Sequence, residues 1–514
     1  MSGCSSRNRR EFLGSAALLG TAVSLTSGPL RAGSPAAAGT VLRPEDFGAR
    51  GDGRTDDTAA FQALGRAVSE QRGGTISMQQ GATYRVGRQI AALGAGAAAY
   101  HDQPMLLISG ADGVIIQGNG ATLKLNDGLY FGSFDPGTGH RFDPPGKARF
   151  TIRSYARVVG KLLEIVDSVN VRIVDLTLDG NMDRLVVGGR WGDVEIQLPA
   201  TGLQLTRVSR VTVENVTCRN NGLDGIYVSG RNTGQAGGPS DDIVFRHVRS
   251  DCNGRQGMSV VGGKGLRFES CTFANTGQGK LSSRPNAGVD IEPNGRNWAT
   301  DLAFVNCTFL NNRQVGLLAD AGNSHTIRVT GCTFWQGFAA GRGTTIGSGD
   351  AFWITKDETV IERCQVHGNV TNLAPSVEVR SCSFDDDVHP LYGRSAQRRP
   401  YLMAQAAGQF TDCRFEVTGG GGRALIIAKA PLTLQHCRLV FGGTGLPARR
   451  AVAFFAPTTT LNDVTISLAR SAARERHYVY GGGARLLGQV SLGSGLHWNS
   501  TTGPVGIIGP KGNS

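Results

Sequence analysis

Apolar residues alternate with variable residues in six short segments of this chain, and the six segments align with one another. Each begins with a glycine or alanine and carries apolar residues at its second and fourth places, whereas its third and fifth places vary. This alternation predicts β-strands with one buried face. The segments are Gly202–Thr206, Gly225–Ser229, Gly257–Val261, Gly288–Glu292, Gly316–Asp320 and Ala351–Thr355.

The spacing of these segments predicts how the strands are arranged. The leading glycines follow one another at intervals of 23, 32, 31 and 28 residues. Recurrence at such intervals is typical of a solenoid, in which no single unit can bury its own apolar face. We therefore predict an all-β fold, a parallel β-helix over residues 106–493, in which the third and fifth places of each strand point outward.

This alignment brings acidic residues together that are far apart in the sequence. Neighbouring strands lie about 4.8 Å apart, and residues i and i+2 of one strand lie about 6.6 Å apart. Asp290, Glu292 and Asp320 should therefore form a compact carboxylate cluster. The third-place residues are Gln204, Tyr227, Ser259, Asp290, Leu318 and Trp353, and the fifth-place residues are Thr206, Ser229, Val261, Glu292, Asp320 and Thr355.

A carboxylate cluster of this kind suits glycoside hydrolysis. Asp290 and Glu292 should be roughly 6–8 Å apart, which overlaps the ~6.5–9.5 Å of inverting enzymes, while Glu292 and Asp320 are nearer the ~5 Å of retaining ones. Mutual repulsion should raise the pKa of at least one carboxyl, as a general acid requires. We predict these three as catalytic residues, with Asp224, which precedes the Gly225 strand, as a further candidate.

Four neighbouring residues are predicted to bind substrate. Tyr227 and Trp353 could stack on sugar rings, and Arg255 and Lys264 could hold acidic groups. A polysaccharide lyase remains an alternative, with Tyr227, Arg255 or Lys264 as base and the three clustered acids holding Ca²⁺. A hydrolase of this kind would need no cofactor.

The cysteines do not form the pattern of a metal site. Seven of the ten occur in the motif Cys-x-(Phe/Val/Leu), once per repeat, and we predict them as an inward column of small apolar side chains. No Cys-x-x-Cys pair is present, so we predict no zinc. The seven are Cys271, Cys307, Cys332, Cys364, Cys382, Cys413 and Cys437.

The N-terminal 38 residues resemble a twin-arginine export signal. Arg9 and Arg10 precede an apolar run, Leu13–Leu25, which is too short to span a membrane stably, and small residues follow at Ala36–Ala38. We therefore expect a periplasmic or extracellular protein without a stable membrane span.

Charge bears on the partner of the protein. The formal net charge is +12, and loss of the export signal, with four arginines and one glutamate, leaves +9. A basic surface favours an acidic polysaccharide, and the alternative is that the charge serves solubility alone. Since no basic run is interleaved with aromatic residues, we predict no nucleic-acid partner.

The segment after the signal carries a resemblance to a known family. Residues 46–62 read Asp-Phe-Gly-Ala-Arg-Gly-Asp-Gly-Arg-Thr-Asp-Asp-Thr-Ala-Ala-Phe-Gln, similar to the N-terminal signature of the pectate-lyase-like superfamily. This superfamily includes polysaccharide-degrading enzymes, phage tailspikes and uronate epimerases. The resemblance implies a right-handed β-helix with a cap over residues 41–105. In the cap, Phe61, Leu64 and Val68 line one side of a helix that ends at Gly73 and Gly74. We expect residues 494–514 to form a loose tail.

No subfamily can be assigned from catalytic motifs. The Asn-Thr-Asp, Gly-His-Gly and Arg-Ile-Lys motifs of polygalacturonases are absent, as is the Trp-Ile-Asp-His motif of calcium-dependent pectate lyases. We expect an exported enzyme that cleaves a polysaccharide, in the first place a glycoside hydrolase. The alternatives are a polysaccharide lyase or uronate epimerase, and a non-catalytic glycan-binding or surface scaffold protein.

Overall fold

A computed structural model describes most of the chain after the predicted export signal, which itself lies outside the described residues. The described residues are 40–87, 103–135, 137–142, 155–189, 197–230, 240–338, 349–394, 400–417, 424–442, 451–469 and 477–499.

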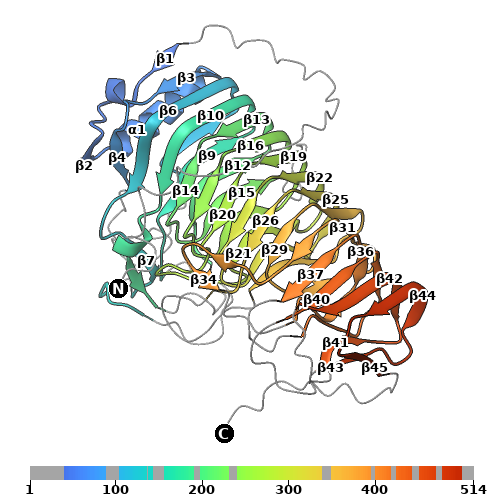
Figure 1. The fold of residues 1–514 in the computed structure, drawn as a ribbon. Helices are drawn as coiled ribbons and strands as arrows, with labels where there is room; N and C mark the ends of the chain where they lie inside the picture. The colour runs from blue at the N-terminus through green and yellow to red at the C-terminus, as the bar shows by residue number, and fades with distance from the viewer. Residues whose placement is uncertain are drawn as a thin grey trace.

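A single α-helix lies at the N-terminal end of the described structure, as the sequence predicts. Helix α1 (Thr58–Glu70) buries Phe61, Leu64 and Val68 completely, and it packs against strand β5 (Leu106–Ser109). The helix covers the first coils of the solenoid (Figure 1). This cover keeps the apolar interior and the strand edges at that end away from water.

The rest of the structure is a parallel β-helix, which confirms the predicted fold class. A typical coil contributes one strand to a 14-stranded sheet, here called the site sheet, and two strands to a 26-stranded sheet, here called the wrapping sheet. Figure 1 shows these coils in order from the N-terminal to the C-terminal end. Pairing between successive coils is parallel in both sheets, so the backbone hydrogen bonds run along the axis of the solenoid.

The site sheet contains one strand from each coil. Its strands are β5, β9 (Gly160–Val166), β12 (Ala200–Thr206), β15 (Asp224–Ser229), β18 (Gln256–Val260), β21 (Ala287–Ile291), β24 (Val315–Ala319), β27 (Asp350–Ile354), β30 (Val370–Leu373), β35 (Leu402–Ala406), β38 (Ile426–Ala428), β41 (Ala451–Phe455), β43 (His477–Tyr480) and β45 (Leu496–Asn499).

The wrapping sheet contains the remaining coil strands and the strands of the cap. They are β1 (Val41–Leu42), β2 (Asp52–Asp56), β3 (Gly74–Ser77), β4 (Thr83–Val86), β6 (Asp112–Leu125), β10 (Val169–Asp179), β13 (Ser209–Glu214), β14 (Thr217–Arg219), β16 (Asp241–Arg246), β17 (Arg249–Asp251), β19 (Gly263–Glu269), β20 (Thr272–Ala274), β22 (Trp298–Val305), β23 (Thr308–Leu310), β25 (Asn323–Thr330), β26 (Thr333–Trp335), β28 (Thr359–Glu362), β29 (Gln365–His367), β31 (Glu378–Arg380), β32 (Ser383–Phe384), β36 (Gly408–Thr411), β37 (Arg414–Val417), β39 (Leu432–Gln435), β40 (Arg438–Phe441), β42 (Thr459–Leu468) and β44 (Arg485–Leu492).

Short elements lie outside these two sheets. Two are 3-10 helices, η1 (Pro44–Phe47) and η3 (Met182–Arg184). The others form a three-stranded sheet of β7 (Tyr130–Ser133), β8 (Ala156–Arg157) and β11 (Val186–Gly188), and a hairpin of β33 (Val388–His389) and β34 (Gly393–Arg394).

The strand register confirms the predicted third-place alignment. Tyr227 pairs with Ser259, Ser259 with Asp290, Asp290 with Leu318, and Leu318 with Trp353. Apolar second and fourth places fill the interior, where the side chains at these places in β15, β18 and β21 are completely buried. The outward positions of neighbouring coils therefore lie side by side along the solenoid.

Close contact between coils explains the glycine that begins each site-sheet segment. A Cβ atom at Gly257 would lie 2.4 Å from the carbonyl oxygen of Gly288, and one at Gly288 would lie 2.6 Å from that of Gly316. These distances are far below van der Waals contact. The glycines let each coil approach the next along this line.

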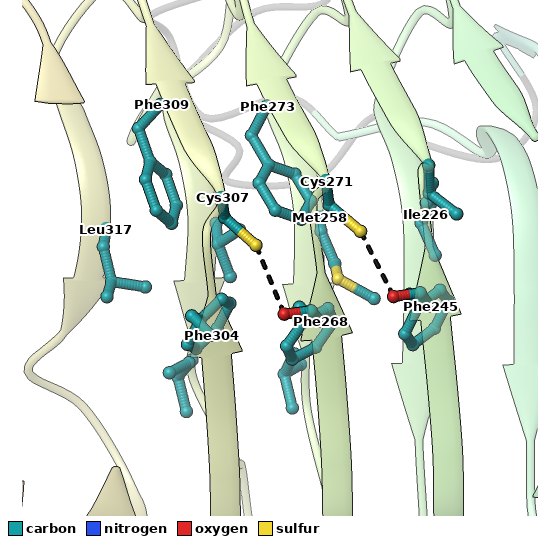
Figure 2. Packing of buried hydrophobic residues seen from close by; sticks show 14 of the residues in the cluster. Ile226, Phe245, Met258, Phe268, Cys271, Phe273, Phe304, Cys307, Phe309 and Leu317 are labelled. Atoms are coloured by element: carbon teal, nitrogen blue, oxygen red, sulfur yellow. Dashed lines mark hydrogen bonds between the residues drawn. The ribbon is translucent and has the colours of Figure 1, made fainter. Parts of the chain in front are cut away.

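The predicted thiol column is present in the core (Figure 2). Its seven cysteines are buried and free, and each thiol donates a hydrogen bond to a backbone carbonyl of the preceding coil, as from Cys271 to Phe245 and from Cys307 to Phe268, both at 3.3 Å. Beside the column, the Phe268 ring stacks on those of Phe245 and Phe304, with centroids 5.1 and 4.4 Å away. The cysteines therefore have a packing role.

Asparagines occupy several corners between the strands of the coils. Asn220, Asn275 and Asn311 have positive φ angles, which asparagine tolerates better than most residues. The Asn221 side-chain amide donates a 2.9 Å hydrogen bond to Asn253 one coil further on. The polar corners are thus bonded along the axis of the solenoid.

The last described strand lies inside the segment that we expected to be a loose tail. Strand β45 pairs with β43, so residues 496–499 belong to the site sheet, whereas residues 500–514 lie outside the described residues. In the part of the chain that the structure describes, no helix is long and apolar enough to cross a membrane.

Candidate functional site

Three acidic residues meet on the outward side of strands β15, β18 and β21. Asp224 begins β15 and is completely buried, and Asp290 on β21 is only 2% exposed. Glu292 follows the end of β21, and its side chain is 26% exposed. The outward direction of Asp290 and Glu292 was predicted, but the burial of Asp224 and Asp290 was not. Glu292 is therefore the member of the three most open to solvent.

Arg255 lies between two of these acids. Its Nη2 atom is 2.6 Å from Oε1 of Glu292, and its Nη1 atom is 3.4 Å from Oδ2 of Asp224. Only 10% of the arginine side chain is exposed. Arg255 was predicted to bind acidic groups of a substrate, but the structure instead places it in ion pairs within the protein.

Gln256 is a site residue that the sequence analysis missed. Its side-chain nitrogen donates hydrogen bonds to Asp290 and, at 3.1 Å, to Oε1 of Glu292. The residue is completely buried. Gln256 pairs with Asp224 in the sheet, directly before the leading glycine of its strand. A comparison of the residues that precede each glycine would have identified it.

The buried carboxyls hold their protons more strongly than ordinary aspartates. Burial, reinforced by the charge of Glu292, raises the pKa of Asp290 well above its usual value, against the opposing effect of Arg255. Burial also raises the pKa of Asp224 to about 6, although Arg255 and a 3.1 Å hydrogen bond from Ser259 act in the opposite direction. The site therefore combines a buried acid, Asp290, whose pKa is raised, with a second acid, Glu292, that receives hydrogen bonds from Arg255 and Gln256.

Tyr227 borders this group as predicted. It pairs with Ser259, which pairs with Asp290, so the tyrosine lies two strands from that acid on the same face. Burial, together with the charges of Asp224 and Glu292, raises its pKa to about 12. The phenol therefore keeps its proton at neutral pH.

Asp320 and Trp353 lie at the edge of the group. Asp320 follows the end of β24 and is exposed, and its charge contributes to the raised pKa of Asp290. Among the hydrogen bonds of the described residues, none joins its carboxylate to the other acids. Trp353 lies two strands beyond Asp290, where it packs against Ala287, Val315 and Leu318.

The prediction that Lys264 flanks the acids is wrong. Lys264 lies on β19 of the wrapping sheet, where it pairs with Asp241 and Thr300 and is exposed. The chain turns between β18 and β19, so a residue only five positions after Ser259 belongs to a different sheet. Distance along the sequence is a poor guide to proximity in a coil with several sides.

The acids do not form the calcium site considered for a lyase. Among the described residues, no group of three histidine, cysteine, aspartate or glutamate side chains is placed to share a metal ion. Asp290 and Glu292 instead share the amide of Gln256, and the guanidinium of Arg255 already provides a cation for Glu292. A calcium ion would compete with that guanidinium, so the donor set does not fit it.

A polar row continues from the acids toward the N-terminal end. Gln204 donates hydrogen bonds to Glu164 and to Thr206, at 2.8 and 3.2 Å, and Lys161 lies 3.1 Å from Oε2 of Glu164. Ser229 adds a 3.2 Å hydrogen bond to Thr206. These residues belong to β9, β12 and β15, so the outward face of the site sheet presents polar groups along the axis of the solenoid.

Comparison with known proteins gives the class of the fold. Residues 164–345 match the family described as "Right handed beta helix region", which confirms the predicted handedness. The A-module of the mannuronan C-5 epimerase AlgE6 from Azotobacter vinelandii has a similar structure, with 16% identity, a TM-score of 0.46, and coverage of 89% of this chain and 99% of that one. No curated protein matches the sequence.

Two other solved structures show how varied proteins of similar fold are. The surface adhesin PfbA of Streptococcus pneumoniae has 10% identity and a TM-score of 0.39, with coverage of 90% of this chain and 98% of that one. The tailspike of the Escherichia coli bacteriophage HK620, solved with a pentasaccharide, has 12% identity and a TM-score of 0.43, with coverage of 89% and 80%. Enzymes and an adhesin thus occur among the structural neighbours.

Proposed function

We propose that this protein is an exported glycoside hydrolase that cleaves a polysaccharide bound along the outward face of the site sheet. The observation that carries the proposal is the contact of Asp290 and Glu292 with the same Gln256 amide nitrogen. One carboxyl is buried and holds its proton more strongly than an ordinary aspartate, and the other is paired with Arg255 and partly open to solvent. A proton donor next to a carboxylate is the arrangement that glycosidic bond cleavage requires.

The two carboxyls have separate roles in this proposal. Asp290 donates its proton to the oxygen of the leaving sugar, and Glu292 acts on the anomeric carbon or on a water molecule beside it. Because both groups bind one nitrogen atom, the bonded oxygens lie within about 6 Å of each other. This separation fits the ~5 Å of retaining enzymes better than the ~6.5–9.5 Å of inverting ones. Glu292 is then the nucleophile, and the anomeric configuration is retained.

The other acids and Tyr227 support this pair. Asp224 and Glu292 share Arg255, so Asp224 helps to fix the guanidinium that orients Glu292. Asp320, at the exposed edge, contacts the sugar chain. Tyr227 offers a ring on the same face for sugar stacking.

Elimination chemistry has less support than hydrolysis. A lyase or epimerase needs a base to remove the proton beside a uronate carboxyl. The Tyr227 phenol holds its proton up to a pKa of about 12, Arg255 is held by two acids, and Lys264 lies on the wrapping sheet. The three residues considered as the base of a lyase are therefore either distant from the acids or unsuited to removing a proton.

Product analysis tests the proposal. Purified mature protein is incubated with a panel of neutral, amino-sugar and acidic polysaccharides, and the products are examined by reducing-end assay, ultraviolet absorbance and proton NMR. We expect new reducing ends with retained anomeric configuration and no unsaturated sugar. Asp290→Asn and Glu292→Gln should each lower kcat by at least about 100-fold.

Three results would contradict this assignment. Unsaturated products would identify a lyase, and full turnover by both variants would place the chemistry elsewhere. A protein that binds a glycan of the panel without altering it would be a binding scaffold. Asp301→Asn, an exposed position on β22 of the wrapping sheet, serves as a control for substitution itself.

A further inference from the structure

The face that carries the proposed catalytic pair is acidic, although the protein as a whole is basic. From β15 to β24, the described outward residues of this face include the acids Asp224, Asp290, Glu292 and Asp320, against a single guanidinium from Arg255. Even without Asp290, acids outnumber the cation, and the two acids nearest to solvent are Glu292 and Asp320.

The cations of the described site sheet near these acids are already engaged. Arg255 binds both Asp224 and Glu292, and its side chain is 10% exposed. Lys161, three strands away from β18, binds Glu164 through both carboxylate oxygens. Recognition of a carboxylate or sulfate on a sugar would need a cation that can turn to it. Both described candidates would first have to leave an acidic partner.

Exposed arginines lie on the other sheet of the coil. Arg267 and Arg328 are exposed on the wrapping sheet, where both pair with Ala303 from opposite sides. Arg414 and Arg438 pair directly with each other on the same sheet, and both are exposed. The net charge of +12 therefore does not describe the face with the candidate site, where the described acids outnumber the cation.

We infer that the substrate of this site is a neutral or amino-sugar polysaccharide, and that a uronate or sulfated chain is excluded from it. The inference rests on the proposed function, because it concerns the sugar that lies beside Asp290 and Glu292. Exposed carboxylates at Glu292 and Asp320 repel an anionic chain and attract an ammonium group. Neutral sugars are held there by hydroxyl hydrogen bonds to the carboxylates and by stacking on Tyr227. This replaces the expectation of an acidic polymer that the net charge suggested.

The test compares three kinds of chain on the full mature protein. The probes are chitosan for amino sugars, galactomannan and glucan for neutral sugars, and polygalacturonate and heparin for acidic ones. Binding is measured by affinity electrophoresis with the Asp290→Asn variant, which lacks the proton donor, and cleavage is measured with the unaltered protein. We expect retention by a neutral or amino-sugar chain and none by polygalacturonate or heparin at physiological salt.

Reversal of the charge at Asp320 tests whether the acidic face causes the binding of the amino-sugar chain. Asp320→Lys should weaken retention by chitosan at least about fivefold more than retention by a neutral chain, because only the amino-sugar chain loses an ionic attraction, and it should reduce the salt dependence of chitosan retention. Glu70→Lys changes the net charge by the same amount at an exposed position on α1, and it should leave every retention unchanged.

The outcomes separate this inference from the proposed function. Cleavage or tight binding of polygalacturonate or heparin, lost on adding salt, would overturn the inference and leave a hydrolase of acidic chains in place. Binding of a neutral or amino-sugar chain without any cleavage would support the inference and overturn the hydrolase. Retention by none of the neutral or amino-sugar chains would also count against the inference.

Discussion

The Nη2 atom of Arg255 lies 2.6 Å from Oε1 of Glu292, although the two residues are 37 positions apart in the chain. Arg255 precedes β18 and Glu292 follows β21, so the contact joins the start of one coil to the site-sheet strand of the next. The same guanidinium reaches back to Asp224 at the start of β15. One cation thus connects three successive coils at the candidate site.

Removal of this cation should damage both stability and activity. In Arg255→Gln, Glu292 and the buried Asp224 would lose their charged partner, and breaking such a pair typically costs about 3–5 kcal/mol. We expect a lower denaturation midpoint in urea and a fall in kcat. Arg172→Gln is the matched control, because its 3.1 Å pair with Glu214 is exposed and should contribute less than about 1 kcal/mol. Equal losses in the two variants would contradict a central role for Arg255.

The raised pKa of Asp290 predicts the pH dependence of stability. The folded protein keeps the Asp290 proton to a higher pH than the unfolded chain, where an aspartate titrates near 3.9. The folded state therefore binds more protons than the unfolded state in that interval, and stability falls as pH rises through it. Asp290→Asn should raise the free energy of unfolding at pH 8 by about 1 kcal/mol or more and change it little at pH 4. Thermal denaturation at several pH values measures this, with Asp301→Asn as a control that should show no such trend.

Activity should depend on the same proton. If Asp290 is the general acid, kcat should be lost as pH rises above the pKa of that carboxyl, since the charged form has no proton to donate. Arg255 lowers this pKa, so Arg255→Gln should move the alkaline limb of the pH–rate profile to higher pH. A profile that stays in place in this variant would mean that another group controls the limb.

Gly257, the second residue of β18, should not tolerate a methyl group. In Gly257→Ala the new Cβ would meet the carbonyl oxygen of Gly288 at 2.4 Å, and the coils would have to separate. We expect a loss of about 1–3 kcal/mol in the free energy of unfolding. Gly137→Ala is the control, because the nearest atom to its added Cβ is an Asp135 side-chain oxygen at an ordinary 3.4 Å. Denaturant titration of both variants gives the comparison.

The seven cysteines of the thiol column should not react with alkylating reagents in the folded protein. Its cysteines are at most 2% exposed, and a thiol that reagents cannot reach does not react with alkylating reagents. Iodoacetamide followed by peptide mass analysis should label the column only after denaturation. Labelling of Cys307 or Cys332 in native protein would show that the coils open there.

The sequence by itself determined the coiled architecture, the residues that fill its interior and the alignment of its outward positions. Apolar second and fourth places, glycines at fixed intervals and the Cys-x-Phe motif each reflect contacts that repeat in every coil, so they leave a period in the chain. The alignment of Asp290 with Tyr227 and Trp353 followed from that period alone, because strand pairing maps equal places onto neighbouring positions. The capping helix was predicted for a similar reason, since Phe61, Leu64 and Val68 carry the period of a helix face.

Only the tertiary structure decided which charges face one another. Arg255 precedes β18 and Gln256 is its first residue, and both come before the glycine at which the predicted alternation starts, so the pattern gives no direction for their side chains. Lys264 turns to another sheet within a few residues. Burial of Asp290 and Asp224 also depends on neighbours from other coils, and their raised pKa values follow from that burial. A repeating pattern fixes the backbone register because every coil shares it, whereas the site arises from side chains that break the repeat, and their contacts exist only once the coils are stacked.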